Sequence, residues 1–269
     1  MTVESALDLF AVRSLLFLPA SNPRAILHAR ESAADLVILD LEDAVKPEDK
    51  AAARAAAVAA LADDWPMPVA IRINSLASEW HGEDMMAIMS AKPDAIVVPR
   101  AEGKDEIAFV RNQTARPVLA MIETAKGLVN VHETAAVSAG LIAGTNDMAA
   151  DLRLPLGAGR RPLHMALQII VLAARAAGIA VFDGVFNGLH DEEGFIAEAE
   201  EGRSHGFDGK SLIHPRQIAP CNAAFAPSAE EVARAERLVA AATGGAERFE
   251  GEMIERMHVE AARRLLGRR

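Results

Sequence analysis

The sequence lacks the features of a disulfide-stabilised, secreted or membrane-embedded protein. It contains a single cysteine, Cys221, which cannot form an internal disulfide, and this favours a reducing compartment. No apolar run approaches the roughly 20 residues of a transmembrane helix, so we expect no membrane association. The opening stretch MTVESALDLFAVRSLLFLPA carries acids where a signal peptide would carry basic residues, which indicates a mature, cytoplasmic protein.

Basic charge is also scarce. The formal net charge is −10 and no long run of Lys or Arg occurs, so nucleic acid is not an expected partner. Apolar residues, in contrast, make up 51% of the 269 residues, which is enough for a sizeable core. A chain of this length fits one α/β barrel or two smaller domains.

Short runs typical of strands alternate with Ala-rich helical patterns along most of the chain. The expected strands span residues 13–20, 35–42, 69–74, 95–100, 117–123, 140–145, 180–186 and 209–214. Eight strands alternating with helices predict a (β/α)₈ TIM barrel. The alternative, an open doubly wound sheet, needs a Gly-rich phosphate turn after its first strand, and PASNPR is not one.

The alternation ends beyond His214. Residues 228–242 have the pattern of a capped amphipathic helix, TGGAERFEG interrupts it, and a last helical segment follows. The sequence therefore predicts a barrel over residues 1–220 and a C-terminal helical extension over residues 221–269. That extension is expected either to pack as a helix or to act as a lid or arm that reaches a neighbouring subunit.

Acids and other polar residues gather at the carboxyl ends of the predicted strands. In a (β/α)₈ barrel these ends form the active site. The residues there are Asp40, Glu42, Asp43, Arg72, Asn74, Arg100, Glu123, Thr145, Asn146, Asp147, Asp183, Asn187 and His214. Converging carboxylates suit a hard cation such as Mg²⁺, and no His or Cys pair at zinc spacing accompanies them.

The residues alone leave alternatives open. Glu123 and Asp147 could instead form structural ion pairs with a barrel arginine, and Arg72 could form a buried bridge to Asp40 or Glu42. Three histidines, at positions 81, 190 and 205, have no evident partners and are expected at the surface.

Six motifs occur in a fixed order: RSLLFLPA, LDLEDAV, IRIN, IETAKGL, GTNDMAADL and GFDGKSLIHPRQ. Together they resemble the citrate lyase β-subunit-like family of CoA-ester lyases, which belongs with the HpcH/HpaI aldolases. The resemblance extends from Arg13 to the end of the chain. It implies a Mg²⁺-dependent (β/α)₈ barrel, usually a homotrimer, that cleaves or forms 3-hydroxyacyl-CoA thioesters.

The resemblance also assigns the central residues. It makes Glu123 and Asp147 the metal ligands, with Glu123 also beside the substrate. Arg72 would bind the carboxylate of a 2-keto acid and orient it bidentately.

Four further residues follow from the same resemblance. Glu42 and Asp43 would be outer acids that hold metal-bound water, and Arg13 corresponds to a residue near the substrate and CoA entrance. Lyases with a C-terminal lid carry the motif MID, whose acid reaches a neighbour's active site. This chain has MIE, so Glu255 stands where an aspartate is expected.

The implied reaction is the reversible retro-Claisen cleavage of a malyl-, citramalyl- or citryl-CoA-like substrate into acetyl-CoA and a 2-keto acid. Two alternatives remain open at this point. The chain could be a citrate lyase β subunit that is active only with an acyl-carrier subunit, or a non-catalytic homologue that binds the keto acid and CoA without turnover.

Overall fold

The computed structural model describes residues 7–267, so the first six residues of the N-terminal stretch interpreted above lie outside it. Eight parallel strands close into a barrel in the order of the sequence, which confirms the predicted architecture. The strands are β1 (Ser14–Pro19), β2 (Leu36–Asp40), β3 (Val69–Arg72), β4 (Ala95–Val98), β5 (Val118–Ile122), β6 (Gly140–Ala143), β7 (Ala180–Asp183) and β8 (Gly209–Leu212). Each lies within one of the eight predicted runs.

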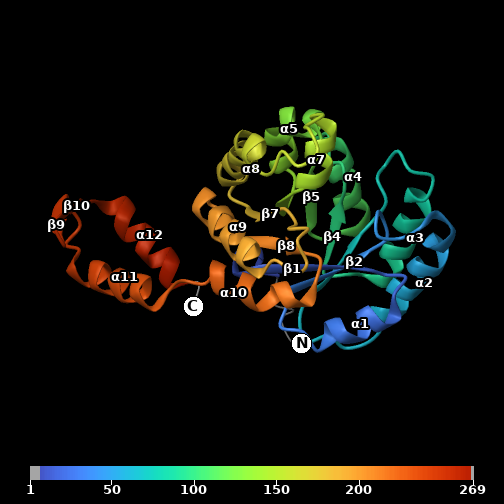
Figure 1. Ribbon diagram of the computed structural model, residues 1–269, viewed down its shortest axis with the longest axis horizontal. Helices are drawn as coiled ribbons and strands as arrows, with labels where there is room; N and C mark the ends of the chain where they lie inside the picture. Colours follow the sequence, from blue (N-terminus) through green and yellow to red (C-terminus); the bar gives the residue numbers. More distant parts are fainter. Residues whose placement is uncertain (1–6, 268–269) are drawn as a thin grey trace. The chain divides into compact units, whose positions relative to one another are not determined.

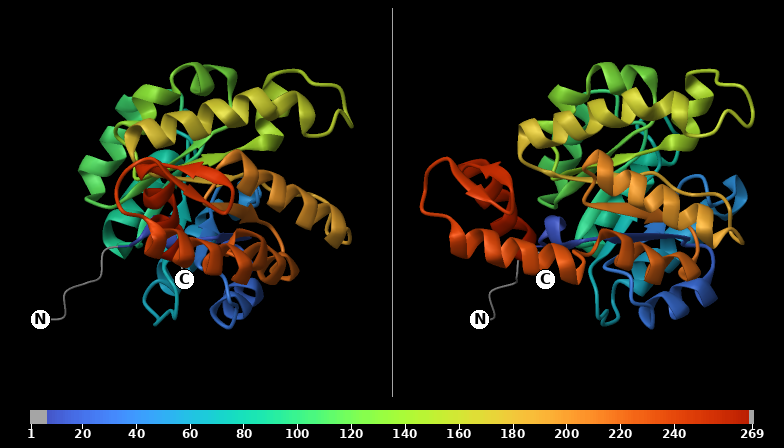
Figure 2. Two further views of the ribbon diagram at one scale, coloured as in Figure 1. Left: turned by 90° about the vertical axis from the view of Figure 1, so that its left-hand side faces the viewer. Right: turned by 60° about the vertical axis from the view of Figure 1, so that its left-hand side comes forward.

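Helices surround the strands on the outside of the barrel (Figures 1 and 2). They are α1 (Pro23–Arg30), α2 (Lys50–Ala60), α3 (His81–Ala91), α4 (Lys104–Thr114), α5 (Ala125–Val129), α6 (Val131–Ala135), α7 (Thr145–Asp151), α8 (His164–Ala177), α9 (Glu192–His205) and α10 (Ile218–Phe225). Short 3₁₀ turns, η1 (Leu9–Ala11), η2 (Pro47–Asp49), η3 (Arg161–Leu163) and η4 (Pro215–Gln217), precede β1, α2, α8 and α10.

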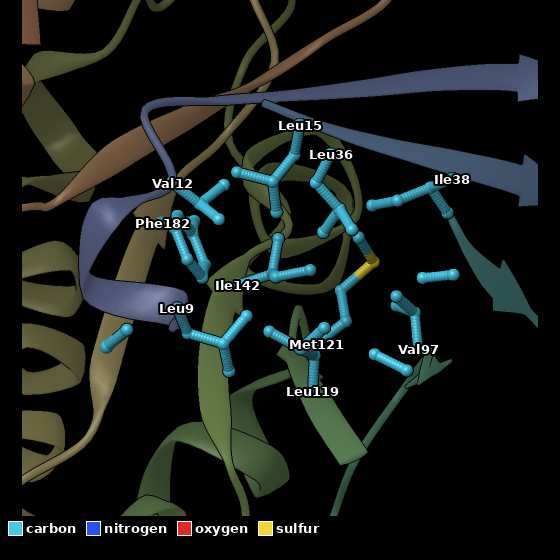
Figure 3. Close-up of a cluster of buried hydrophobic side chains, with 13 residues drawn as sticks. Leu9, Val12, Leu15, Leu36, Ile38, Val97, Leu119, Met121, Ile142 and Phe182 are labelled. Atoms are coloured by element: carbon cyan, nitrogen blue, oxygen red, sulfur yellow. The ribbon is translucent and has the colours of Figure 1, made fainter. Parts of the chain in front are cut away.

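The half of the barrel interior nearer the amino ends of the strands is filled by apolar side chains from most of the strands. Figure 3 shows Leu15, Leu36 and Phe182 pointing toward a common centre. Leu9, from the 3₁₀ turn η1, and Val12 join this cluster from the segment before β1, so they close the amino-terminal end of the barrel. The opposite, carboxyl-terminal end is therefore the one left for a site.

Strand periodicity decides which polar residues enter the barrel. Successive side chains of a strand point to opposite faces. In β2 the core residues Leu36 and Ile38 point inward, so Asp40 points inward as well. Arg72 stands two residues after the inward Ala70 of β3, and Glu123 stands two residues after the inward Met121 of β5, so both side chains also point inward. The barrel thus places charged side chains in a layer above its apolar core.

The chain divides into two compact units, Met1–Ala224 and Phe225–Arg269. The second unit contains α11 (Ala229–Ala241), a hairpin of β9 (Glu247–Phe249) and β10 (Glu252–Ile254), and α12 (Arg256–Leu266), all drawn in red in Figure 2. Leu238, Phe249, Ile254 and Ala262 form its own small core. β9 lies in the stretch that the sequence suggested only as an interruption. β10 takes the first three residues of the predicted last helix, which instead begins at Arg256, so that part of the prediction is wrong.

Among the described residues, no helix combines the length and the apolar character needed to cross a membrane.

Candidate active site at the mouth of the barrel

A pocket of about 410 Å³ opens at the carboxyl ends of the strands. This volume lies within the roughly 300–1,000 Å³ of small-molecule sites. Its lining comes from every barrel strand end or following loop except those of β4: Phe17, Leu18, Pro19, Asp40, Asp43, Ala44, Arg72, Met121, Glu123, Ala143, Gly144, Thr145, Asn146, Asp147, Val185, Ser211 and Ile213. The pocket therefore brings together Arg72, Glu123 and Asp147, as the sequence predicted.

Arg72 is held by acids on the strand beside it. Asp40 is its register partner in β2, and accepts hydrogen bonds from Nε at 2.7 Å and from Nη2 at 2.6 Å. Nη1 lies 2.9 Å from Glu42 Oε2 and 3.9 Å from Asp43 Oδ2. Asp40 thus occupies the bidentate side of the guanidinium, which is the buried bridge that the residues alone left open, so the expected bidentate contact to a substrate carboxylate is not available. Nη1, which is ion-paired with Glu42, is the nitrogen that a ligand could share.

The predicted ligand pair has a different environment. Glu123 is 3% exposed, and its burial, with a contribution from Asp147, raises the pKa of its carboxyl to about 7. Burial and then the nearby Asp43 raise the pKa of Asp147 as well. Within residues 7–267 neither carboxylate forms an ion pair, although Glu123 Oε1 accepts the backbone N–H of Arg100 at 2.6 Å. These two acids therefore lack the cation that Asp40 has in Arg72.

Glu42 is the third acid beside the pocket whose pKa is raised. Desolvation raises the pKa of its carboxyl to about 8, and the Arg72 guanidinium opposes that shift only in part. Glu42 and Asp43 both lie beside Arg72, so the structure brings these two predicted outer acids to the edge of the site.

Two backbone features that the sequence did not reveal hold Glu123 in place. Arg100 has a left-handed backbone, with φ of +48°, which a non-glycine residue rarely adopts. This conformation accompanies the short hydrogen bond from its N–H to Glu123. Gly144, after β6, lies so close that a Cβ there would be 2.4 Å from the Cβ of Glu123. Gly144 stands two residues after the inward Ile142 of β6, so the alternation of the strand could have predicted that position 144 faces the barrel interior.

A buried lysine fixes the loop that carries the outer acids. Lys50 donates to the backbone oxygens of Leu41 and Glu42, and to Asn74 Oδ1, each at 2.7 Å. Asn74 in turn bonds to Asp84 of α3. Because Lys50 satisfies three oxygens at once, it sets the position of the loop after β2 relative to β3.

Arg13 does not lie at the pocket. It precedes β1 at the amino-terminal end of the barrel, where its Nε and Nη2 bond to the two carboxylate oxygens of Asp35 at 2.8 and 3.0 Å. Pro19, which does line the pocket, is six residues further along the chain, and this separation corresponds to about 20 Å of strand. Arg13 thus lies away from the pocket of its own barrel, and the position near the substrate and CoA entrance that the resemblance implies is not found there.

Asp183 is also absent from the pocket lining, since it follows the inward Phe182 in β7 and therefore points outward. Lys210 and Arg160 bond to it at 2.9 and 2.8 Å. Although burial alone would raise its pKa, these two cations lower it. Asp183 belongs to an ion network between the barrel and α9.

Glu255 belongs to the second unit. It stands immediately before α12, and its backbone N–H donates to Nδ1 of His258 at 2.9 Å. Its role as the acid of a lid is still a prediction.

The expectation of surface histidines holds for one of the three. His190 is exposed, whereas His81 is buried with Nδ1 2.9 Å from the backbone oxygen of Asn74. His205 is partly shielded, with its ring centroid 5.2 Å from that of His164. Sequence position alone could not show these partners because they come from other elements.

Comparison with known proteins gives consistent results. Residues 13–215 match the family model described as HpcH/HpaI aldolase/citrate lyase. A (3S)-malyl-CoA thioesterase of Cereibacter sphaeroides strain KD131 is 40% identical over 95% of this chain and 94% of that protein. The citrate lyase subunit beta of Leuconostoc mesenteroides subsp. cremoris is 35% identical over 94% and 92%. The crystal structure of CitE from Mycobacterium tuberculosis in complex with magnesium, acetoacetate and coenzyme A matches with a TM-score of 0.86 and 33% identity, over 96% of this chain and 98% of that one.

Proposed function

Because the chain belongs to the HpcH/HpaI aldolase/citrate lyase family, we propose that it cleaves a carbon–carbon bond in a malyl-, citramalyl- or citryl-CoA-like thioester. The products would be acetyl-CoA and a 2-keto acid, and the reaction would need Mg²⁺. The observation that carries this proposal is the convergence of Glu123, Asp147 and Arg72 on one pocket.

The donor set of the pocket fits the metal. Mg²⁺ prefers oxygen ligands and commonly takes one or two carboxylates from the protein. Glu123 and Asp147 would be those ligands, since both line the pocket and neither is neutralised by an ion pair among the described residues. When bound, Mg²⁺ supplies Lewis-acid polarisation of substrate oxygens.

Arg72 would orient the substrate. Its Nη1 would donate to the carboxylate of the substrate, while Asp40 keeps the guanidinium plane fixed. Such a preset donor loses little side-chain entropy on binding, which favours a productive orientation.

Cleavage also requires proton transfer. A base takes the proton of the 3-hydroxyl group, the electron pair of the broken bond passes to the α-carbon of the thioester as an enolate, and that carbon then takes a proton. We assign the proton transfer to Glu255, which would act from the second unit, over a neighbouring subunit if the chain forms a homotrimer. Glu42 and Asp43 would hold water at the edge of the pocket.

Hydrolysis of the thioester is the second candidate, and the 40% identity to a (3S)-malyl-CoA thioesterase favours it. The two reactions differ in their products. Purified protein with Mg²⁺ would be incubated separately with malyl-CoA, citramalyl-CoA and citryl-CoA, with EDTA and a Glu123→Gln variant as controls. EDTA-sensitive acetyl-CoA and keto acid would establish the lyase, whereas free CoA with the intact hydroxy acid would establish the hydrolase and overturn the lyase proposal.

Two further outcomes would change the assignment. Turnover only of a thioester carried by an acyl-carrier protein would identify a citrate lyase β subunit. Tight binding of CoA and keto acid with no turnover of either substrate form would identify a non-catalytic homologue.

The role of Glu255 has its own test. Glu255→Ala should reduce turnover by about 10²–10⁴-fold, the usual contribution of a general acid–base group, and leave Mg²⁺ affinity unchanged. Glu230→Ala, which removes an exposed acid in the first turn of α11, is the matched control. If the wild-type protein is active and the Glu255→Ala variant retains full activity, then Glu255 has no role in the mechanism.

A further inference from the structure

A second group of potential metal ligands lies between two outer helices of the barrel. His164 begins α8, while Glu201 and His205 are four residues apart near the end of α9. One ligand atom from each of the three lies within 4.8 Å of the other two. The helices already contact one another here, because Gln168 of α8 donates to the backbone oxygen of His205 at 3.1 Å.

One of the three distances between ligand atoms is close to that in a zinc site, and the other two are at most 4.8 Å. Zinc bonds to imidazole nitrogen and carboxylate oxygen are about 2.0–2.2 Å, so ligand atoms in a tetrahedral site are about 3.3 Å apart. His164 Nε2 and Glu201 Oε1 are 3.0 Å apart. The remaining separations need side-chain movements of at most about 1.5 Å, which partly exposed side chains can make.

The surrounding charges leave an excess of one negative charge. Arg160 lies 2.7 Å from Glu201, and it also pairs with Asp183 and Glu198. Lys210 pairs with the same Asp183 and Glu198. Three carboxylates thus face two cations, so a divalent ion bound through neutral imidazoles would be compensated in part. The contact from Arg160 would also orient Glu201, as outer partners of metal ligands do.

His205 provides an independent sign that the group is incomplete. Its Nδ1 atom is shielded from solvent and has no hydrogen-bond partner within residues 7–267. A buried polar atom without a partner costs about 1–3 kcal/mol. Reorientation of this ring onto a cation would turn the unpaired Nδ1 atom into a ligand.

We propose that His164, Glu201 and His205 form a second cation site, for a zinc-class divalent ion, on the outside of the barrel. Imidazole ligands favour zinc and its transition-metal neighbours over the hard Mg²⁺ ion expected at the barrel mouth. Three protein ligands leave a fourth position for water. The bound ion would connect the first turn of α8 to the last turn of α9, and the site does not depend on the reaction proposed above.

The test uses the untagged full chain with the mouth ligands removed. In a Glu123→Gln, Asp147→Asn background, calorimetric titration with Zn²⁺ should show one ion bound per chain. Adding His205→Ala should weaken that binding by more than the about 10–100-fold that loss of an outer partner costs, because a direct ligand is removed. His28→Ala, on the exposed face of α1, is the matched control and should leave the affinity unchanged.

A second measurement does not rely on calorimetry. Zn²⁺ should raise the unfolding temperature of the background protein and of its His28→Ala derivative, but not of its His205→Ala derivative. Cys221 would not compete for the ion, because burial raises the pKa of its thiol to about 12. Absence of Zn²⁺ binding in the background protein, or binding that survives both His164→Ala and His205→Ala, would overturn the proposal.

A third experiment applies if the background variant fails to fold. Co²⁺ is then added to the wild-type protein in excess Mg²⁺. A tetrahedral visible spectrum lost in His205→Ala supports the site, and its absence from the wild-type protein overturns it.

Discussion

Substitution of Gly144 by alanine should disturb the metal site through a single steric contact. A Cβ at this position would lie 2.4 Å from the Cβ of Glu123 and 2.5 Å from its Oε2. The φ of Gly144 is −95°, which alanine adopts without strain. Any effect of Gly144→Ala must therefore come from the contact and not from the backbone conformation.

The contact cannot be relieved by a change of rotamer. Ordinary contacts of a Cβ begin near 3.4 Å, so the two atoms would have to separate by about 1 Å. The Cβ of Glu123 is fixed by its backbone, and the N–H of Gly144 bonds to the oxygen of Ile122 next to it. We expect the free energy of unfolding to fall by about 1–3 kcal/mol, as in other overpacked interiors. A 1 Å displacement of a site residue can cost about 10²-fold, and we expect a loss of Mg²⁺ affinity of that order.

Calorimetric titration with Mg²⁺ and urea denaturation would measure the two effects separately. Gly82→Ala is the matched control, because a Cβ there meets nothing within 4 Å and alanine suits its place in α3. A folded Gly144→Ala protein whose Mg²⁺ dissociation constant stays within about twofold of wild type would refute the idea that the site depends on the position of Glu123.

Three other perturbations test the remaining contacts. Arg72→Lys should weaken binding of glyoxylate, measured by calorimetry, by about tenfold or more, because one ammonium cannot bond to both oxygens of Asp40 and also face the pocket; equal binding would show that Nη1 is not a ligand contact. Mg²⁺ affinity should rise up to about tenfold per pH unit until pH 7 and then level off, because the pKa of Glu123 is raised from 4.5 to about 7 and its proton must leave. The raised pKa also means that the metal-free protein should lose stability as the pH rises through 7; flat profiles between pH 5.5 and 8 would contradict both statements. Lys50→Met should lower the free energy of unfolding by about 3–5 kcal/mol and also reduce turnover. Lys210→Met breaks a buried network outside the barrel, so it should reduce stability with less effect on turnover. Equal losses of turnover in the two variants would assign Lys50 a purely structural role.

Much of the barrel could be predicted because its signals are local. Each strand is a short apolar run between helical segments, and burial on both faces requires such runs in a parallel sheet. The hairpin of β9 and β10 could not be predicted in this way, since each strand has three residues and its pairing depends on contacts in its own small core.

The direction of each strand-end side chain was also contained in the sequence, although only in combination with the core. Asp183 was placed with the mouth residues because it ends a strand, whereas its neighbour Phe182 takes the inward position. Parity assigns Asp40, Arg72 and Glu123 inward and Asp183 outward once a single core residue per strand is known. The left-handed backbone of Arg100, in contrast, has no sequence signal of the kind that glycine provides.

The charge balance of the pocket could not be predicted, because it depends on which strands are neighbours. The sequence shows several acids at the mouth without indicating which of them a cation neutralises. The register of β2 and β3 places Asp40 directly opposite Arg72, and Glu42 forms a second ion pair with the Nη1 atom of the same guanidinium. Glu123 lies just beyond β5 and Asp147 at the start of α7, and among the described residues neither forms an ion pair with Arg72. Burial raises the pKa of both carboxylates, and Asp147 adds to the shift of Glu123, so the pair requires either a proton or an external cation. Glu123 and Asp147, which no cation pairs with among residues 7–267, are therefore the acids that a metal ion would stabilise most.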